Sequence, residues 1–581
     1  MKIKFQYKVV VVLMILVTHL SFSQKKDENI GTEVVNVVKP YSPTISDAFK
    51  VKETPSLEDE DNSKKENIQY TIFSFPVAST FAPNKGKASG VEKVAQEKLF
   101  SNYATLAAGN YGTINAELFV TQKLENEDYI GLMARHLSSQ GGIKNIELND
   151  SFYDTSIDAT YGSKSQKISW NTDIGYQNQI YNWYGLSPTL YQGLTPENKD
   201  VFIKGINPKQ SYNNVYVGGR LAFNESVLKQ ASIKFNRFWD AFGSGENHFV
   251  AKPSLEFKVI DEKIKLNLAL DYINGSFEKN YLNGNGFTYG FTNVSLQPNY
   301  AINQDNLSIN IGATFTYSLS SSQNKLFVYP NLVASYKLVG DLMIGYAGIE
   351  GGLQQNSYQD FVQNNFFVSP TLAITPTDKK FDVYLGVKGK LSNVIGYNIR
   401  GSIVNETNKA LYKNNVYTSS NTNINGYALG NSFDVVYDNL KTASFFGELK
   451  ADFSKNVTFG VNGTFNSYTT DIQKEAWNLP TFKVGANLDL QLTPKWLFGT
   501  NVFFVGERKD QFVDTSLVVP VTDVTLGSYF DLNAKVDYKR NEKLTFFLKG
   551  NNLANQNYQR WIDYPVQGIQ VLLGANYKFD F

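Results

Sequence analysis

A two-residue alternation of apolar and polar side chains runs through most of this 581-residue chain. It is clearest at the C-terminus, where seven odd positions are apolar or aromatic: Ile569, Val571, Leu573, Ala575, Tyr577, Phe579 and Phe581. The even positions there are mostly polar, and Leu572 is the main exception. Successive side chains of a β-strand point to opposite faces, so the pattern predicts strands with one apolar face and one polar face.

The same alternation recurs in residues 457–467, 482–491 and 530–538, with amides and charges in mid-strand on the polar face. A soluble sandwich or propeller also alternates, but many of these segments are longer than its usual strands of about five or six residues. Strands of about 10 residues with one unbroken apolar face are typical of membrane barrels, which must close because lipid offers no hydrogen bonds. We therefore predict an all-β, antiparallel, up-and-down transmembrane barrel. Its lumen-facing polar residues would include Asn487, Asp489, Asp531, Asn533, Lys535 and Asp537.

Composition narrows the possible functions. Aromatic residues make up 14% of the chain, and 43 Gly against 17 Pro favour strands with glycine punctuation. A net charge of +1 offers no concentrated basic face for nucleic acid. The chain has no Cys and only three His, so thiol chemistry is excluded and options for metal binding and general-base catalysis are few. We predict a non-enzyme with no metal, cofactor or catalytic residues.

The N-terminus resembles an export signal. Lys2, Lys4 and Lys8 precede an apolar run at residues 9–17, and Ser21 and Ser23 stand just before Gln24. The run is shorter than the roughly 20 residues of a membrane-spanning helix, so we predict a signal peptide at residues 1–23. Residues 24–98 would form a periplasmic or lumenal extension, partly disordered over the charged stretch 52–67. Residues 99–581 would form the barrel, in the outer membrane of a Gram-negative cell.

Every second connection between the predicted strands is short. Examples are residues 125–128, 224–226, 339–341, 454–456 and 540–542. Outer-membrane barrels have such tight turns on the periplasmic side and longer loops outside. About 24 segments look like strands, but 366–375 and 432–437 break the rhythm. If both belong to long extracellular loops, the count is 22, which we prefer; 24 is the alternative.

The C-terminal stretch 544–581 resembles the end of TonB-dependent receptor barrels. The matching positions are Asn552, Leu553, Tyr558, Pro565, Gly568 and Phe581, and residues 448–471 are similar to the late strands of that family. The resemblance implies 22 strands, which agrees with the count from the turns. Members of that family carry a plug domain of more than a hundred residues. The 75 residues of segment 24–98 are too few for one, so we expect a barrel without the plug.

Two short segments acquire candidate roles from this resemblance. Five residues are similar to the segment by which such receptors pair with TonB as an added strand: Glu33, Val34, Val35, Val37 and Val38. The same segment could instead occlude the lumen or dock on another periplasmic subunit. Tyr577, Phe579 and Phe581 are similar to the terminal signal that the outer-membrane insertion machinery recognises. The expected partners are outer-membrane lipid, that machinery, and TonB or subunits of an outer-membrane complex.

A 22-stranded cylinder is wide, and known barrels of this size are plugged. Inward-folded loops, the N-terminal extension or a partner must therefore fill it. Two functions remain: transport of a bulky solute across the outer membrane, or a non-transporting structural role in an outer-membrane assembly or secretion complex. The aromatic loop 181–194 would either stack on a ligand or join the interfacial aromatic girdle. Phe361, Phe366 and Phe367, in another long loop, leave the same two options open.

Overall fold

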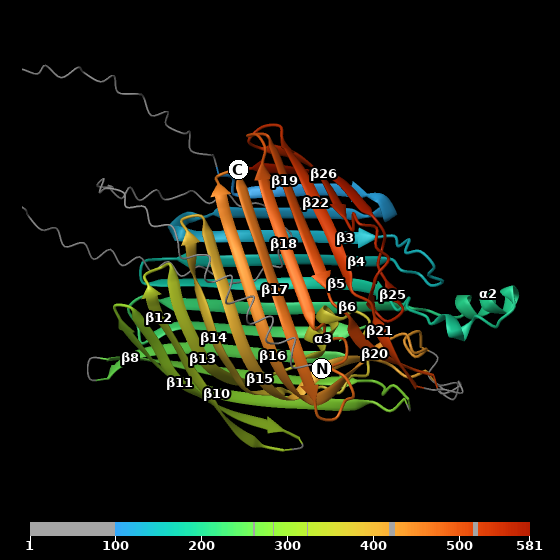
Figure 1. The fold of residues 1–581 in the computed structure, drawn as a ribbon, viewed down its shortest axis with the longest axis horizontal. Helices are drawn as coiled ribbons and strands as arrows, with labels where there is room; N and C mark the ends of the chain where they lie inside the picture. The colour runs from blue at the N-terminus through green and yellow to red at the C-terminus, as the bar shows by residue number, and fades with distance from the viewer. Residues whose placement is uncertain (1–98, 260–261, 283, 322, 418–424, 515–520) are drawn as a thin grey trace, which may run out of the picture. The chain divides into compact units, whose positions relative to one another are not determined.

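The computed structural model describes residues 99–259, 262–282, 284–321, 323–417, 425–514 and 521–581. The predicted signal peptide, the predicted extension and the five residues from Glu33 to Val38 lie outside these ranges. In the described ranges, one 22-stranded antiparallel sheet dominates the fold (Figure 1). Its strands are β1 (Asn102–Gly109), β2 (Ile114–Lys123), β3 (Asp128–Ser139), β4 (Phe152–Lys164), β5 (Ile168–Asn182), β6 (Lys209–Phe223), β7 (Leu228–Asp240), β8 (Gly245–Val259), β9 (Glu262–Phe277), β10 (Phe287–Gln304), β11 (Leu307–Ser320), β12 (Lys325–Val339), β13 (Met343–Gln354), β14 (Thr377–Ser392), β15 (Ile395–Asn414), β16 (Phe433–Ser454), β17 (Val457–Thr470), β18 (Phe482–Gln491), β19 (Trp496–Val505), β22 (Tyr529–Lys539), β23 (Leu544–Asn551) and β26 (Gln570–Phe579).

The sheet closes into a barrel. Strand β1 pairs with β2 on one side and with β26 on the other, from Asn102 opposite Phe579 to Gly109 opposite Leu572. Closure removes the unpaired strand edges that lipid could not satisfy. The prediction of 22 strands is confirmed, and the alternative of 24 is wrong. Residues 366–375 form no strand, in agreement with the preferred count. Residues 433–437 were expected to belong to a loop, but they extend the start of β16.

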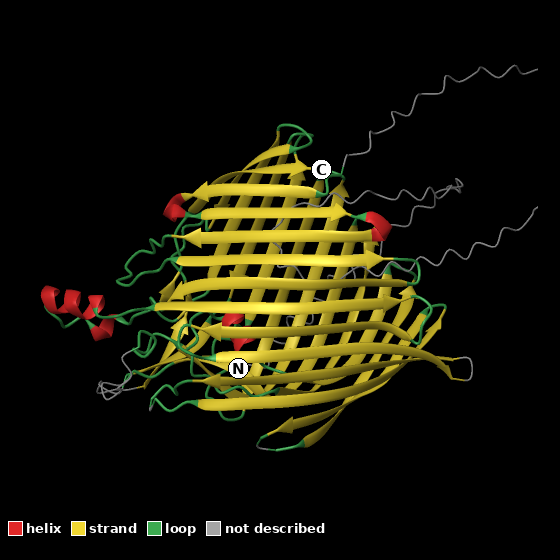
Figure 2. Ribbon diagram, turned by 180° about the vertical axis from the view of Figure 1, so that it is seen from behind, coloured by secondary structure: helices red, strands yellow, loops and turns green. Residues whose placement is uncertain are grey.

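Connections alternate between the two ends of the barrel because neighbouring strands are antiparallel. Tight turns lie at one end, for example between β2 and β3, β10 and β11, β16 and β17, and β22 and β23, and the start of β1 and the end of β26 lie at the same end. We name this the turn end and the opposite one the loop end. Figure 2 shows the strands side by side, with a short red helix standing away from the barrel. That helix is α2 (Pro196–Lys204), which belongs to the loop between β5 and β6.

The loop end carries the other secondary structure, apart from one short 3-10 turn between β2 and β3. A second helix, α3 (Tyr358–Asn364), lies between β13 and β14. Two hairpins stand in the connections to β22 and β26: β20 (Arg508–Val513) with β21 (Val521–Leu526), and β24 (Gln559–Trp561) with β25 (Tyr564–Pro565). Three short 3-10 turns complete the described elements: η1 (Asn110–Gly112), η2 (Glu125–Glu127) and η3 (Pro188–Leu190).

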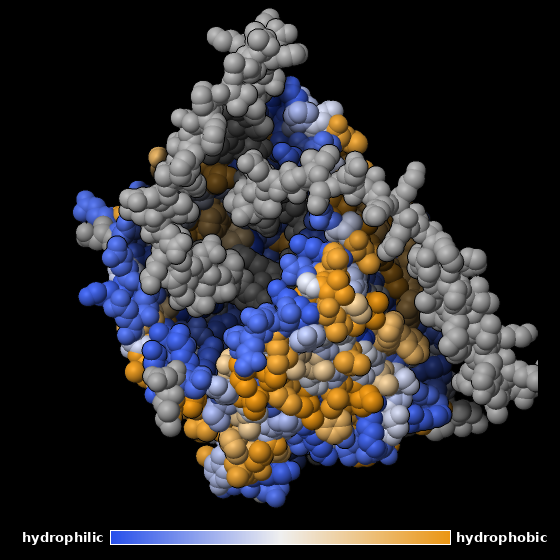
Figure 3. Space-filling model, turned by 60° about the vertical axis from the view of Figure 1, so that its left-hand side comes forward, coloured by the Kyte–Doolittle hydropathy of each residue, from blue (hydrophilic) through white to orange (hydrophobic). Residues whose placement is uncertain are grey.

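The outer face of the barrel is apolar, as the alternation predicts. Leu385 and Leu573 are 69% and 66% exposed, and Figure 3 shows hydrophobic side chains gathered over part of this surface. Exposed apolar area costs about 25 cal/mol per Å² in water, so the natural surroundings of such a face are hydrocarbon. In the described ranges, no helix is both long and apolar enough to span a membrane.

The alternate residues of each strand point to the inner face. One of them is Leu572, the exception to the C-terminal alternation. Leu572 lies buried with Ala107 and Phe547, from the two strands that flank β26. A small apolar cluster on the inner wall therefore explains an irregularity that the sequence pattern alone does not.

Candidate functional site: the closed loop end

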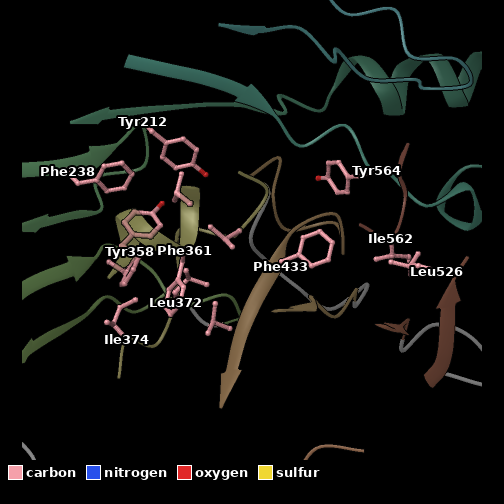
Figure 4. Packing of buried hydrophobic residues seen from close by; sticks show 14 residues of the cluster. Tyr212, Phe238, Tyr358, Phe361, Leu372, Ile374, Phe433, Leu526, Ile562 and Tyr564 are labelled. Atoms are coloured by element: carbon pink, nitrogen blue, oxygen red, sulfur yellow. The ribbon is translucent and has the colours of Figure 1, made fainter. Parts of the chain in front are cut away.

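A buried aromatic and aliphatic cluster crosses the loop end of the barrel (Figure 4). Its members come from the wall strands β6, β7, β9 and β16, from the connection between β13 and β14, and from the connections to β22 and β26. They are Tyr212, Phe238, Phe277, Tyr358, Phe361, Val362, Val368, Leu372, Ile374, Phe433, Val435, Leu526, Ile562 and Tyr564. Because one cluster joins wall strands from distant parts of the sheet, inward-folded loops pack across this end, and we name this packing the closure.

The centre of the closure is residues 355–376, which we name the strap. Helix α3 begins after Ser357, whose hydroxyl oxygen accepts a hydrogen bond from the Asp360 backbone at 3.0 Å and caps the helix. The helix directs Tyr358, Phe361 and Val362 into the cluster, and none of them is more than 4% exposed. A helix of seven residues, about two turns, would not be stable on its own in water, so tertiary packing holds it.

Two carboxylates fix the strap to one wall. The Tyr358 backbone N–H donates to Glu246 Oε2 at 2.7 Å, and the Tyr289 hydroxyl donates to the same oxygen at 2.5 Å. The Tyr358 hydroxyl donates to Asp240 Oδ2 at 2.8 Å. Glu246 and Asp240 are almost fully buried. Buried carboxylates require such donors, so loss of the strap would leave both of them with fewer partners.

The far side of the strap is bonded to β16. The Tyr437 hydroxyl donates to the Ala373 carbonyl at 2.8 Å and accepts from the Thr375 N–H at 3.0 Å. Phe433 bonds the strap in both directions, because its N–H donates to the Phe367 carbonyl at 3.0 Å and its carbonyl accepts from Ser369 at 2.8 Å. The strap therefore spans the mouth between β8 and β16.

Other loops bond the strap and one another. Trp183 Nε1 donates to the Phe367 carbonyl at 3.2 Å, and the Asn431 side chain donates to the Trp183 carbonyl at 2.9 Å. The Tyr564 hydroxyl donates to the Asn431 carbonyl. The Tyr184 hydroxyl donates to the Pro565 carbonyl at 3.0 Å.

These contacts correct our expectation for the two aromatic loops. Trp183 is fully buried, and Tyr181 stacks on Phe366 of the strap with 3.9 Å between ring centroids. Phe367 stacks on Tyr564 at 3.8 Å, and Phe361 belongs to the buried cluster. The rings therefore pack into the closure rather than forming an interfacial girdle or an open stacking surface.

The two hairpins bring two carboxylates to the loop end: Asp510, which is buried, and Asp563, which is half-buried. Asp510 on β20 accepts hydrogen bonds from the Asn478 side chain at 2.8 Å and the Asn414 backbone at 3.1 Å. Burial raises the pKa of Asp510 to about 6. Burial, together with the neighbouring Asp510 charge, also raises the pKa of Asp563 to about 6. The closed arrangement therefore responds to protons in the mildly acidic range.

The six polar residues proposed for the lumen lie at alternate positions of β18 and β22. Tyr558 from the last loop donates to Asp531 Oδ2 at 3.0 Å, and the Asn552 backbone donates to Asn533 Oδ1 at 3.1 Å. Lys535 Nζ and Asp537 Oδ1 form an ion pair at 3.1 Å. Asn487 and Asp489 stand on β18, separated from these residues by β19, where Asn501 lies opposite both Asn487 and Asn533.

The three C-terminal aromatic residues form a run at the turn end. Tyr577 is 46% exposed on β26 and stacks with Phe579 at 6.0 Å between centroids. Phe581 follows the strand, meets Phe579 edge-on at 5.6 Å and is 81% exposed. Their predicted role in assembly stays a prediction.

The described residues contain no group of three or more His, Asp and Glu side chains arranged to hold a metal. His136 has hydroxyl partners, with Nδ1 at 2.8 Å from Thr155 and Nε2 at 3.0 Å from Ser138. His248 bonds Asp271 at 2.8 Å. Sequence reasoning missed the carboxylates Asp240 and Glu246 and the strap as a unit. The one available signal was the clustering of aromatic residues in long connections, which does not reveal which way a loop folds.

No protein-family model and no curated protein matches the chain. Several solved structures are similar in fold, each over most of both chains. The ferric-catecholate import receptor Fiu of Escherichia coli K12 is 11% identical, with a TM-score of 0.60 over 83% of this chain and 82% of that one. The siderophore receptor PirA of Acinetobacter baumannii is 12% identical, with a TM-score of 0.62 over 82% and 80%.

The outer-membrane ferripyoverdine receptor of Pseudomonas aeruginosa is 13% identical, with a TM-score of 0.58 over 83% of this chain and 72% of that one. At these identities the likeness carries the fold and nothing finer. The chain described here has the closed 22-stranded β-barrel fold of outer-membrane receptors.

Proposed function

We propose that the chain is a reduced, plugless relative of TonB-dependent receptors that moves a bulky solute across the outer membrane, with the strap as its gate. The observation that carries the proposal is the closed loop end, where residues 355–376 are bonded to β8 on one side and β16 on the other. A wide barrel must be closed at rest, and here loops supply a closure that a separate domain would otherwise provide. The fold similarity to iron and siderophore receptors supports a transport class.

The test is to remove the closure without shortening the chain. In one variant, residues 357–369 are replaced by a Gly/Ser linker of equal length, which deletes the anchoring side chains and keeps the reach. The matched control replaces residues 196–204, the protruding helix α2, whose side chains are not buried. In planar lipid bilayers the wild type and the control should stay closed. The strap variant should give large, long-lived conductance steps.

The alternative function is a structural subunit of an outer-membrane assembly or secretion complex. The observation that favours it is the quality of the closure, which packs aromatic rings as a protein core does instead of leaving an open mouth. A strap variant that folds but remains silent in bilayers would support this alternative. It would contradict a transport route through the loop end.

Engagement of TonB is part of the transport proposal and rests on Glu33, Val34, Val35, Val37 and Val38. Strand addition needs backbone N–H groups, which proline lacks. We expect Val35→Pro to abolish capture of the full-length protein by the periplasmic part of TonB, while Val51→Pro, outside the segment, leaves capture intact. Equal capture of both variants would remove TonB from the proposal.

A further inference from the structure

The inner wall near the turn end holds a recess of about 440 Å³ that the closure does not use. It is lined by side chains from β8 to β13. Half of the twelve lining residues are amides: Asn267, Gln297, Asn299, Asn303, Asn310 and Asn331. Asparagine is disfavoured in strands, so six amides on neighbouring strands of one wall are not explained by strand formation. Recesses of this volume are within the range of small-molecule sites.

Register places the recess on the lumen side. Asn299 of β10 stands opposite Lys265 of β9 and Gly312 of β11, and Gly312 stands opposite Asn331 of β12. The neighbouring residues of opposite parity include Leu296 and Ile311, which are 42% and 46% exposed on the outer face. Since parity alternates along each strand, the amide row points inward.

The amides hold one another in place. Asn331 Nδ2 donates to Asn299 Oδ1 at 3.1 Å, and Asn299 Nδ2 donates to the backbone carbonyl of Gln297 at 3.1 Å. Asn267 Nδ2 donates to Gln297 Oε1 at 3.4 Å, and Asn267 Oδ1 accepts from the Ser254 hydroxyl at 2.8 Å. An amide has two N–H donors and a carbonyl with two lone pairs, so each bonded amide keeps capacity for a further partner. The side chains are thus oriented in advance, and both donors and acceptors remain available.

Glycine at position 312 makes room for this arrangement. A Cβ atom there would lie 2.3 Å from Asn299 Oδ1 and 2.7 Å from the Pro298 carbonyl. Any other residue at position 312 would therefore displace Asn299 or the neighbouring backbone. The position of Asn299 in the row depends on Gly312.

Charge in the recess is balanced. Two cations, Lys263 and Lys265, face two anions, Glu256 and Glu350. Lys263 Nζ lies 3.8 Å from Glu256 Oε1, and Glu350 accepts from the Tyr384 hydroxyl at 2.9 Å. There is no excess of one sign to select an ion, whereas paired donors and acceptors match hydroxyl groups, which both donate and accept.

We propose that this recess is a subsite for a neutral, hydroxyl-rich solute such as an oligosaccharide, reached from the turn end. The inference deepens the proposed transport function by naming a solute class, and binding can be measured whether or not flux occurs. Among the residues that the structure describes, no aromatic side chain lines the recess, so binding depends on hydrogen bonds and is weak. Weak binding suits a conduction path, from which a solute must leave as readily as it enters.

The test uses the full-length protein in detergent and saturation-transfer NMR with three probes: maltotriose, triglycine and inorganic phosphate. We expect maltotriose to bind saturably. Its affinity should fall about tenfold, or about 1.4 kcal/mol, in the double variant Gln297→Leu/Asn331→Leu, which keeps side-chain volume and removes the amides. Gly312→Ala should also weaken binding. Asn501→Leu, an amide of the same kind on β19, is the control and should bind as wild type does.

Each outcome decides a separate point. Equal affinity of the wild type and the double variant, or no saturable maltotriose signal, would overturn the subsite. Preference for phosphate or triglycine would overturn the neutral class of solute. Folded protein migrates faster on unheated gels, so a variant without this shift has failed to fold. If the double variant fails to fold, the affinity of Gly312→Ala for maltotriose tests the subsite instead. Failure of conductance in the strap variant, with maltotriose binding intact, would contradict the transport proposal alone.

Discussion

At the scale of single residues, the loop end depends on a few polar atoms that meet inside an apolar cluster. Tyr358 is the clearest case, because its backbone bonds Glu246 and its hydroxyl bonds Asp240. Both carboxylates belong to wall strands, whereas Tyr358 belongs to the strap. One residue therefore connects a loop to the barrel through two buried groups, and removing one of its atoms should have a local effect.

We expect Tyr358→Phe to loosen the strap by about 1.5–3 kcal/mol, the usual range for a hydrogen bond to a charged group. Hydrogen exchange should quicken at strap amides such as Phe361 and Asn365, while barrel amides keep their protection. Tyr153→Phe is the control, since its hydroxyl bonds Gln140 at 3.2 Å in an exposed position. Unchanged exchange in the strap would show that packing alone closes the mouth.

Gly426 is a second residue on which the closure depends. A Cβ atom there would lie 1.9 Å from the Asn207 carbonyl oxygen, which is backbone and cannot rotate away. We expect Gly426→Ala to cost about 1–3 kcal/mol of loop packing and to increase cleavage of the loop end in limited proteolysis. Gly447→Ala, where no heavy atom lies within 4 Å, should behave as wild type. Equal cleavage patterns would argue against this contact.

At the scale of elements, the strap and the two hairpins are connections whose apolar side chains form one buried core with the wall strands. Their hydrogen bonds go to wall strands or to one another, and their aromatic rings occupy one cluster. The hairpins also carry Asp510 and Asp563, whose raised pKa values couple this packing to pH.

The hairpins should close more tightly as pH falls from 7 to 5. Both carboxyl groups have a folded pKa of about 6, above the usual value of 3.8, so the closed form binds more protons than the opened form in this range. The free energy of opening therefore rises as pH falls through about 6 and levels off near the ordinary carboxyl pKa. Hydrogen exchange at residues 508–513 and 559–565, corrected for intrinsic rates, measures it.

Asp563→Asn is the informative variant for this coupling, because an amide stands in for the protonated carboxyl group. Protection of residues 559–565 in the variant should depend less on pH than in the wild type. Slower opening at pH 7 than at pH 5 in the wild type would contradict the sign of the effect.

At the scale of the whole molecule, closure between β1 and β26 joins the first and last strands of a long chain. The last strand pairs with β23 on one side and with β1 on the other, so it completes the closed sheet. We expect deletion of Phe581 to lower the yield of folded barrel more than it lowers the stability of the barrel that does fold. Among the described aromatic residues, Phe579 is the one that this exposed ring contacts, so little packing is lost.

Yield is measured as the fraction of chain that migrates faster when unheated, and stability as the urea concentration that removes this band. Deletion of Asp580 together with Phe581 tests whether the ring alone matters. A full yield of folded Phe581-deleted protein would contradict the assembly role.

Local sequence determined the strands, their two faces and their number. Alternation at a period of two is a property of each strand, and hydrocarbon outside the barrel selects the same apolar face throughout, so 22 strands could be counted from turns. Residues 433–437 look like a strand in the sequence but were assigned to a loop, because the pattern does not show that they continue into the strand that follows.

Tertiary structure alone decided where the loops go. Nothing near Tyr358 in the sequence indicates Asp240 or Glu246, which lie 118 and 112 residues away. The direction in which a loop folds depends on partners contributed by distant strands, and those become neighbours only once the sheet has closed. The number and type of aromatic residues in 181–194 and in the strap do not show whether these rings contact lipid, a ligand or one another. Their mutual burial depends on the curvature of the finished barrel, which no local pattern encodes.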